Sequence, residues 1–99
     1  MNVNLTDIAQ EELAKVVDTR KDTNKDLRIY IQGMGWSGPS FGIALDEQKE
    51  GDQVVEKDNL KFLLDKDMVN NFNEFNIDYS NNWLRKGFYV TADNSGSHC

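Results

Sequence analysis

Near the start of the chain, apolar residues recur with a helical period. Within residues 6–19 they fall on one stripe, at Ala9, Leu13, Val16 and Val17, the spacing of an amphipathic helix. Thr6 or Asn4 can cap the first turn, and Asp7 stands where the helix dipole favours an acidic side chain. The pattern predicts a helix over residues 6–19.

The period then changes to two, which is typical of strands. Residues 27–32 alternate, with Leu27, Ile29 and Ile31 on one face, and alternation resumes after a small-residue loop at 33–39 with Phe41, Ile43 and Leu45. Residues 53–65 contain two more strand-like runs. The acidic stretch before them, residues 46–53, predicts a solvated hairpin turn, with carboxylates at Asp46, Glu47, Glu50 and Asp52.

A second helical period follows, with apolar residues at Met68, Val69, Phe72 and Phe75. It predicts a short helix over about residues 67–75, capped by Asp65 or Asp67. Brief strands are expected at 76–80 and 88–92, with a turn at 81–87. The order indicates a β-rich α+β domain: two small packed sheets, mostly antiparallel or mixed, with an N-terminal helix and a short second helix.

The length allows one domain, residues 1–99, with a flexible C-terminal tail at 92–99. A mobile segment is expected over 93–99 in particular, because it lacks apolar anchors. The predicted core consists of Leu13, Val16, Ile29, Ile31, Ile43, Leu45, Phe62, Phe72 and Phe88.

Composition narrows the range of partners. The formal net charge is −6, and an acidic surface repels phosphate backbones, so no nucleic acid partner is expected. No apolar run approaches the roughly 20 residues that span a bilayer, and the N-terminus lacks the pattern of a signal peptide. With a single cysteine, Cys99, the chain cannot form an internal disulfide. These features predict a cytoplasmic protein with no membrane contact.

Gly33, Gly35 and Gly38 have the GxGxxG spacing of a dinucleotide-binding loop. Such a loop needs a helix that begins at its third glycine and binds the pyrophosphate at its N-terminus. Here Pro39 and a strand period follow, which argues against nucleotide binding. Two interpretations stay open: a turn between two strands, in which glycine supplies positive φ or close approach, and a metal-site loop whose key residue has changed.

The order of several segments resembles the HesB-like, A-type family of iron–sulfur cluster assembly proteins. The segments are an amphipathic helix, the strand "LRIYIQ", the loop "GMGWSGPSFGIALDE", then "NLKFLLDKDMVNNFNEFNIDY", "GFYVT" and a short tail with a cysteine. The resemblance covers nearly the whole chain. It implies a HesB-like fold, iron or an iron–sulfur cluster as cargo, protein partners in cluster assembly, and a homodimer.

The family places one cysteine in the first loop and a Cys-Gly-Cys near the C-terminus, because thiolates are the soft ligands that these clusters require. This sequence departs from that pattern. Trp36 stands at the loop position and offers no metal lone pair. Cys99 matches the first tail cysteine, with His98 beside it, and the second is missing. One chain therefore offers one thiol and one imidazole, too few for a [2Fe–2S] cluster, so no cofactor is expected in the protein as written. Two tails in a dimer could supply Cys₂His₂, a set that suits zinc or a Rieske-like cluster.

Each of these three residues has an alternative interpretation. Cys99 is a metal ligand or an exposed terminal thiol, and His98 a ligand or an ordinary tail residue. Trp36 is a packed aromatic that plugs a vacated metal site, an exposed anchor for a partner, or the product of a UGA codon, since some similar proteins carry selenocysteine in this loop.

The predicted function is that of an iron–sulfur cluster carrier or a relative of one, disabled at position 36. It is not an enzyme, because its chemistry would be ligand exchange. The rival hypothesis is a metal-free module of the same fold, which binds partners through the glycine loop and Trp36.

Overall fold

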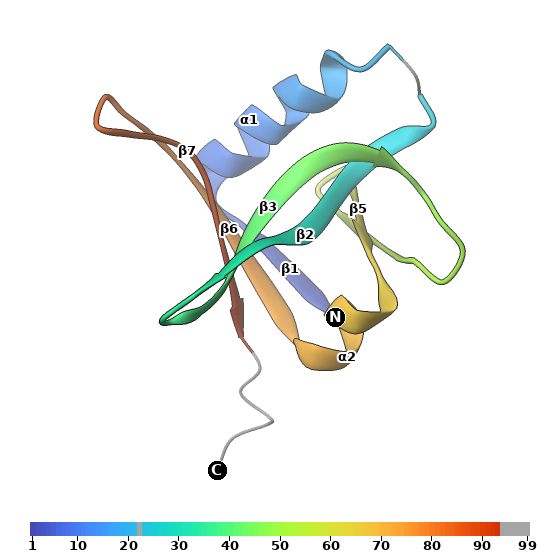
Figure 1. Ribbon diagram of the computed structural model, residues 1–99. Helices are drawn as coiled ribbons and strands as arrows, with labels where there is room; N and C mark the ends of the chain where they lie inside the picture. The colour runs from blue at the N-terminus through green and yellow to red at the C-terminus, as the bar shows by residue number, and fades with distance from the viewer. Residues whose placement is uncertain (22, 94–99) are drawn as a thin grey trace.

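The computed structural model describes residues 1–21 and 23–93, which form two helices and seven strands (Figure 1). In chain order these are β1 (Asn2–Leu5), α1 (Asp7–Asp18), β2 (Lys25–Gly35), β3 (Gly38–Glu47), β4 (Gln53–Lys57), β5 (Leu60–Leu64), α2 (Lys66–Asn71), β6 (Glu74–Asn82) and β7 (Arg85–Asp93). Within the described part of the chain, neither helix is long and apolar enough to cross a membrane.

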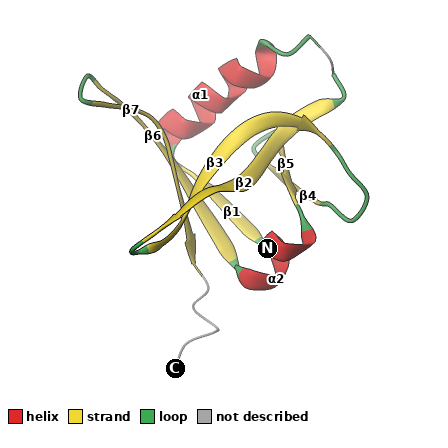
Figure 2. Ribbon diagram, viewed as in Figure 1, coloured by secondary structure: helices red, strands yellow, loops and turns green. Residues whose placement is uncertain are grey.

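The strands form two mixed sheets (Figure 2). One has three strands in the order β1-β6-β7, and the other has four in the order β3-β2-β5-β4. β1 pairs parallel with β6, and β2 pairs parallel with β5, while the other neighbours are antiparallel. The predicted fold class, a β-rich α+β domain with two small mixed sheets, is confirmed. The sequence prediction missed β1, a strand of four residues next to the α1 cap.

Side-chain caps begin both helices. The Thr6 hydroxyl accepts a hydrogen bond from the Ala9 amide at 3.2 Å and begins α1 as expected. The Asp65 carboxylate accepts one from the Met68 amide at 3.0 Å and begins α2. The prediction of a helix to residue 75 was wrong in its second half, because Phe72 already has extended backbone and β6 begins at Glu74.

The hydrophobic core lies between the two sheets and under α1. Its fully buried large side chains come from both sheets and from the helix: Phe62, Phe75, Leu13, Leu27, Ile29, Leu63, Leu64 and Ile77. Val16, Ile43, Leu45, Phe72 and Phe88 are half-buried against it. Ile31 was predicted to be buried but is 46% exposed. There β2 has extended beyond its pairing with β5, and a bulge shifts its register with β3 between Ile31 and Gly33.

Two long hairpins extend from this core. β2 and β3 pair as far as Gly35 and Gly38, and β6 and β7 pair as far as Asn82 and Arg85. The turn expected over 81–87 is therefore only two residues long. Ala92 and Asp93, expected in the flexible tail, belong to β7, whereas residues 94–99 lie outside the described part.

Candidate functional site

The glycine motif closes the β2–β3 hairpin. Gly35 pairs with Gly38, and only Trp36 and Ser37 lie between them. Gly38 has a φ of +111°, a conformation that residues with side chains rarely adopt, which explains the glycine at the point where the chain enters β3. The chain continues from Gly38 as a strand, so there is no helix N-terminus to hold a pyrophosphate. The expectation that no helix begins at Gly38 is confirmed.

Trp36 stands at the tip of this hairpin and is fully exposed. It does not plug a site, so the packed-aromatic interpretation is wrong. Met34, two residues earlier on β2, is 76% exposed. The tip thus presents a large aromatic and a flexible apolar side chain to solvent.

A groove lies beside the tip, between β3 and β7. Its lining comes from the start of β3, from the residue after α2 and from the end of β7: Ser37, Pro39, Phe41, Phe72, Val90, Thr91 and Ala92. Phe41 and Phe72 meet edge to face, with ring centroids 5.2 Å apart. We call this the β3–β7 groove; it has an aromatic base and begins next to Trp36.

The strand that leads to the tail ends at the same groove. Thr91 and Ala92 line it, and Asp93 ends β7, where its carbonyl accepts a hydrogen bond from the Asn73 amide at 3.0 Å. Cys99 comes six positions after Asp93, and six residues span at most about 20 Å. The structure thus brings Ser37, the neighbour of position 36, and the end of β7 into the lining of one groove. His98 and Cys99 themselves lie outside the described residues.

The described residues offer no iron site of their own. Within residues 1–21 and 23–93, no three His, Cys, Asp or Glu side chains gather closely enough to hold a metal ion. The Trp36 indole carries an N–H donor and no metal lone pair. The chain's one thiol, Cys99, and its one imidazole, His98, are both in the tail.

Sequence reasoning missed a cluster of charges at the other end of β2. The Arg28 guanidinium binds Asp52 through two nitrogens, at 2.5 and 3.1 Å, and binds Asp46 through Nε at 2.6 Å. The Asp52 side chain is only 3% exposed and that of Arg28 12%. The acidic turn was therefore wrongly predicted to be wholly solvated, because two of its carboxylates fold back onto β2.

This cluster holds its groups in their charged forms. The Asp52 carboxylate raises the pKa of Arg28, and the Arg28 guanidinium in turn lowers the pKa of Asp52. Hydrogen bonds from Lys49, from the Glu47 amide and from Arg28 lower the pKa of Asp46. Each of these charged groups has a partner, so we infer that the cluster holds the β3–β4 turn against β2.

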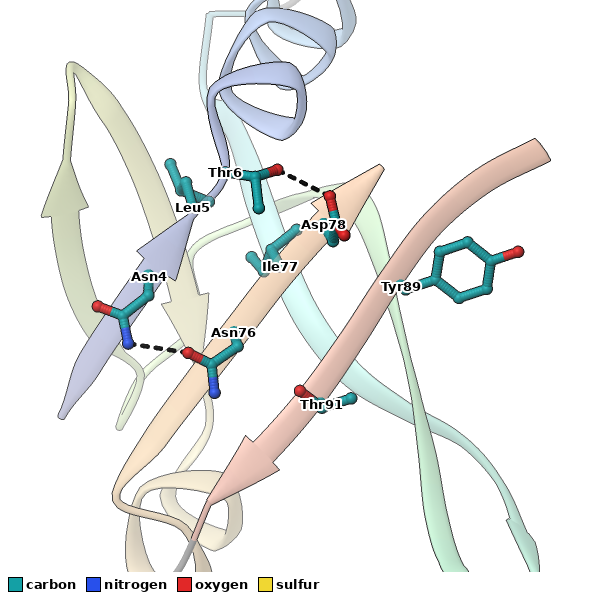
Figure 3. A pocket seen from close by; sticks show the side chains of 8 residues that line it. All are labelled: Asn4, Leu5, Thr6, Asn76, Ile77, Asp78, Tyr89 and Thr91. Atoms are coloured by element: carbon teal, nitrogen blue, oxygen red, sulfur yellow. Dashed lines mark hydrogen bonds between the residues drawn. The ribbon is translucent and has the colours of Figure 1, made fainter. Parts of the chain in front are cut away.

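A second hollow lies on the outer face of the three-stranded sheet (Figure 3). Asn4 donates a hydrogen bond to Asn76, and Thr6 donates one to Asp78, each at 2.9 Å, across the parallel pair β1 and β6. These bonds join neighbouring strands, and Asn4 also donates to the Glu74 carboxylate. The hollow shows a sheet surface with a single carboxylate, that of Asp78, and no metal-binding cluster.

The fold and the site define a class: a β-rich domain in which a glycine hairpin and the strand leading to a cysteine-bearing tail flank one groove. The chain belongs to the iron–sulphur cluster biosynthesis family, whose model matches residues 1–99. This confirms the HesB-like, A-type resemblance.

Known relatives agree with this assignment. An iron–sulfur cluster insertion protein, ErpA, of Hydrogenovibrio crunogenus is 32% identical over 98% of this chain and 87% of its own length. The crystal structure of Escherichia coli SufA matches with a TM-score of 0.75 and 16% identity, over 99% of this chain and 86% of SufA. The structure of IscA with the [2Fe–2S] cluster matches with a TM-score of 0.70 and 20% identity, over 98% and 88% of the two chains. At these identities the two structures support the fold.

Proposed function

We propose that this protein handles iron or an iron–sulfur cluster as cargo and passes it to partner proteins by ligand exchange, without enzymatic turnover. The observation that carries the proposal is the β3–β7 groove. It brings the hairpin position where the family places its first cysteine close to the strand that leads to Cys99. A cargo held there would have the open surface beside the tip as its route of exchange.

The ligands in this proposal are the Cys99 thiolate and the His98 imidazole. Trp36 contributes none, so one chain supplies two ligands where a [2Fe–2S] cluster takes four. A homodimer would double the set. Because each chain supplies only two ligands, the protein with Trp36 should bind a cluster weakly. We place the protein in the cytoplasm with the other components of cluster assembly.

Anaerobic reconstitution with iron and sulfide tests the proposal. The protein as it stands should remain nearly colourless, and Trp36→Cys should bind several times more iron and sulfide per chain, because a thiolate then stands beside the groove. Cys99→Ser in the Trp36→Cys background should remove the gain, since both thiolates serve one site. Leu84→Cys is the matched control, because it adds an exposed cysteine to the tip of the other hairpin.

Equal uptake by the original, Trp36→Cys and Leu84→Cys proteins would contradict a ligand site at the groove. A gain that survives Cys99→Ser would show that the tail does not take part.

The full exposure of Trp36 favours a second candidate function, a metal-free module that binds a partner through this tip. The codon for residue 36 separates the two. TGG supports a tryptophan selected for contact, whereas TGA supports a selenocysteine position and hence a redox-active ligand in the natural loop.

A further inference from the structure

The tip of the β6–β7 hairpin exposes two large apolar side chains. Trp83 is 87% exposed and Leu84 is 68% exposed, and they are the two residues that connect the strands. Tryptophan is enriched among the residues that dominate binding at protein interfaces. The tip points away from the body of the molecule (Figure 1), so a partner could reach both side chains.

The charge around this tip is opposite to that of the molecule. Residues 79–92 contain no Asp or Glu, and Arg85 and Lys86 follow directly on Leu84. The chain as a whole carries −6, so the rest of it carries −8 once these two positive charges are set aside. We call residues 81–86 the basic finger.

Hydrogen bonds and a ring contact brace the hairpin around Trp83 and Leu84. The Asn82 side-chain oxygen accepts a hydrogen bond from the Leu84 amide at 3.0 Å, and the Ser80 hydroxyl accepts one from the Asn82 amide at 3.3 Å. Below them, Tyr79 and Phe88 pack across the hairpin with ring centroids 4.8 Å apart. A preorganised tip loses little conformational freedom on binding, which favours affinity.

We propose that the basic finger docks into an apolar pocket with an acidic rim on a partner protein. Trp83 and Leu84 would fill the pocket, while Lys86 would meet the rim and the positive charge of Arg85 would add to the attraction. The acidic body would keep the rest of the molecule away from the same acidic surface, so charge would orient the encounter.

Two other surfaces fit the finger less well. Each basic residue near an anionic membrane contributes only about 1 kcal/mol to binding. Two such residues do not offset the repulsion between the membrane and a body of net charge −8. Nucleic acid binding needs several phosphate contacts, and the finger offers two positive charges.

Docking at the finger would leave the β3–β7 groove free. The finger meets β7 at Arg85, and the groove is lined by residues 90–92 of the same strand, about 17–23 Å further along at the usual rise per residue. The inference does not depend on cluster handling, since none of its residues lines the groove.

Photo-crosslinking followed by titration tests the proposal. A photoreactive phenylalanine analogue at position 83, in the cells that make the protein, should crosslink one protein with an acidic surface, and the analogue at the exposed position 56 is the control. With that protein purified, calorimetry should show that Trp83→Ala weakens binding by about 30-fold or more. Arg85→Glu with Lys86→Glu should weaken it about tenfold, and the remaining affinity should depend less on salt.

Three results would overturn the proposal. The first is that the analogue at position 83 crosslinks no protein that the analogue at the control position does not also crosslink. The second is that the double charge reversal leaves the affinity for the partner unchanged. The third is cosedimentation of the protein with phosphatidylglycerol vesicles that is lost in Trp83→Ala, which would assign the finger to a membrane surface.

Discussion

The two long hairpins of this domain both end in an exposed tryptophan, yet their surroundings differ. The β2–β3 tip is rich in glycine and borders the β3–β7 groove, where the tail begins. The β6–β7 tip has asparagine and basic residues and lies at the far end of β7. An exposed tryptophan alone says little about function; the neighbouring groove and charge give Trp36 and Trp83 different proposed roles.

The two hairpins are also fastened to the molecule in different ways. β6 and β7 contribute Phe75, Ile77 and Val90 to the core between the sheets. The β2–β3 hairpin adds the Arg28 ion pairs to its own buried residues. Substitutions at the base and at the tip of each hairpin should therefore differ in their effect on stability.

Phe75→Ala should destabilise the whole domain. Phe75 is fully buried at the base of the β6–β7 hairpin and contacts Phe41 edge to face at 5.2 Å, across the two sheets. Loss of a buried phenylalanine usually costs about 3–5 kcal/mol. Urea denaturation measures the change, and a loss below about 1 kcal/mol would show that the sheets do not pack through this ring.

Asp52→Asn should cost about 1–3 kcal/mol, because it leaves the Arg28 charge with one carboxylate partner in a mostly buried position. Glu50→Gln on the same turn is the control and should change stability by less than about 0.5 kcal/mol, as its side chain is exposed. Equal effects of the two changes would mean that the cluster contributes no more than any surface charge.

The same pair predicts how stability depends on pH. The fold lowers the pKa of Asp52 and of Asp46, whereas an unfolded aspartate titrates near 3.9. Their contribution is therefore fully present above about pH 4 and is lost as the pH falls through the lower pKa values of the folded state. Urea denaturation at several pH values between 7 and 2 measures this. The free energy of unfolding should fall more steeply with decreasing pH for the original protein than for Asp52→Asn.

Gly38→Ala should cost about 1–3 kcal/mol, since its φ of +111° strains any residue with a side chain. Gly35→Ala, at the paired position, is the matched control. Its φ is not positive, and an added Cβ would come no closer than 3.9 Å to the Gly38 carbonyl oxygen. Similar losses in the two variants would indicate that backbone conformation does not require the glycine at Gly38.

Much of this fold follows from local patterns in the sequence. The α1 stripe and the caps at Thr6 and Asp65 are local features, and the structure confirms them. Phe72 and Phe75 were misassigned because a spacing of three suits a helix face, and only pairing of β6 with β1 and β7 identifies the strand. Ile31 continues the apolar alternation of β2 without a break. Its exposure arises because β5 pairs with β2 only near Leu27 and Arg28, which the alternation does not predict.

The site was predictable in part. The sequence identified position 36 and the tail as parts of one family pattern, but the groove beside the hairpin tip depends on β3 lying beside β7, which no local pattern contains. The Arg28 cluster joins residues 18 and 24 positions apart. Its one signal was an arginine in a strand close to an acidic turn, which is also the appearance of an ordinary charged surface.

The smallest effect expected on stability is at the two tips. Trp36→Ala and Trp83→Ala should each change the free energy of unfolding by less than about 0.5 kcal/mol, because both side chains are almost wholly exposed in the free protein. Urea denaturation of the two variants beside Phe75→Ala measures this directly. Small changes would show that neither tryptophan is needed for folding. A loss above about 1.5 kcal/mol at either tip would instead mean that its indole packs against the protein in solution. The two hairpins would then differ in how their tips pack, and not only in the groove and the charge beside them.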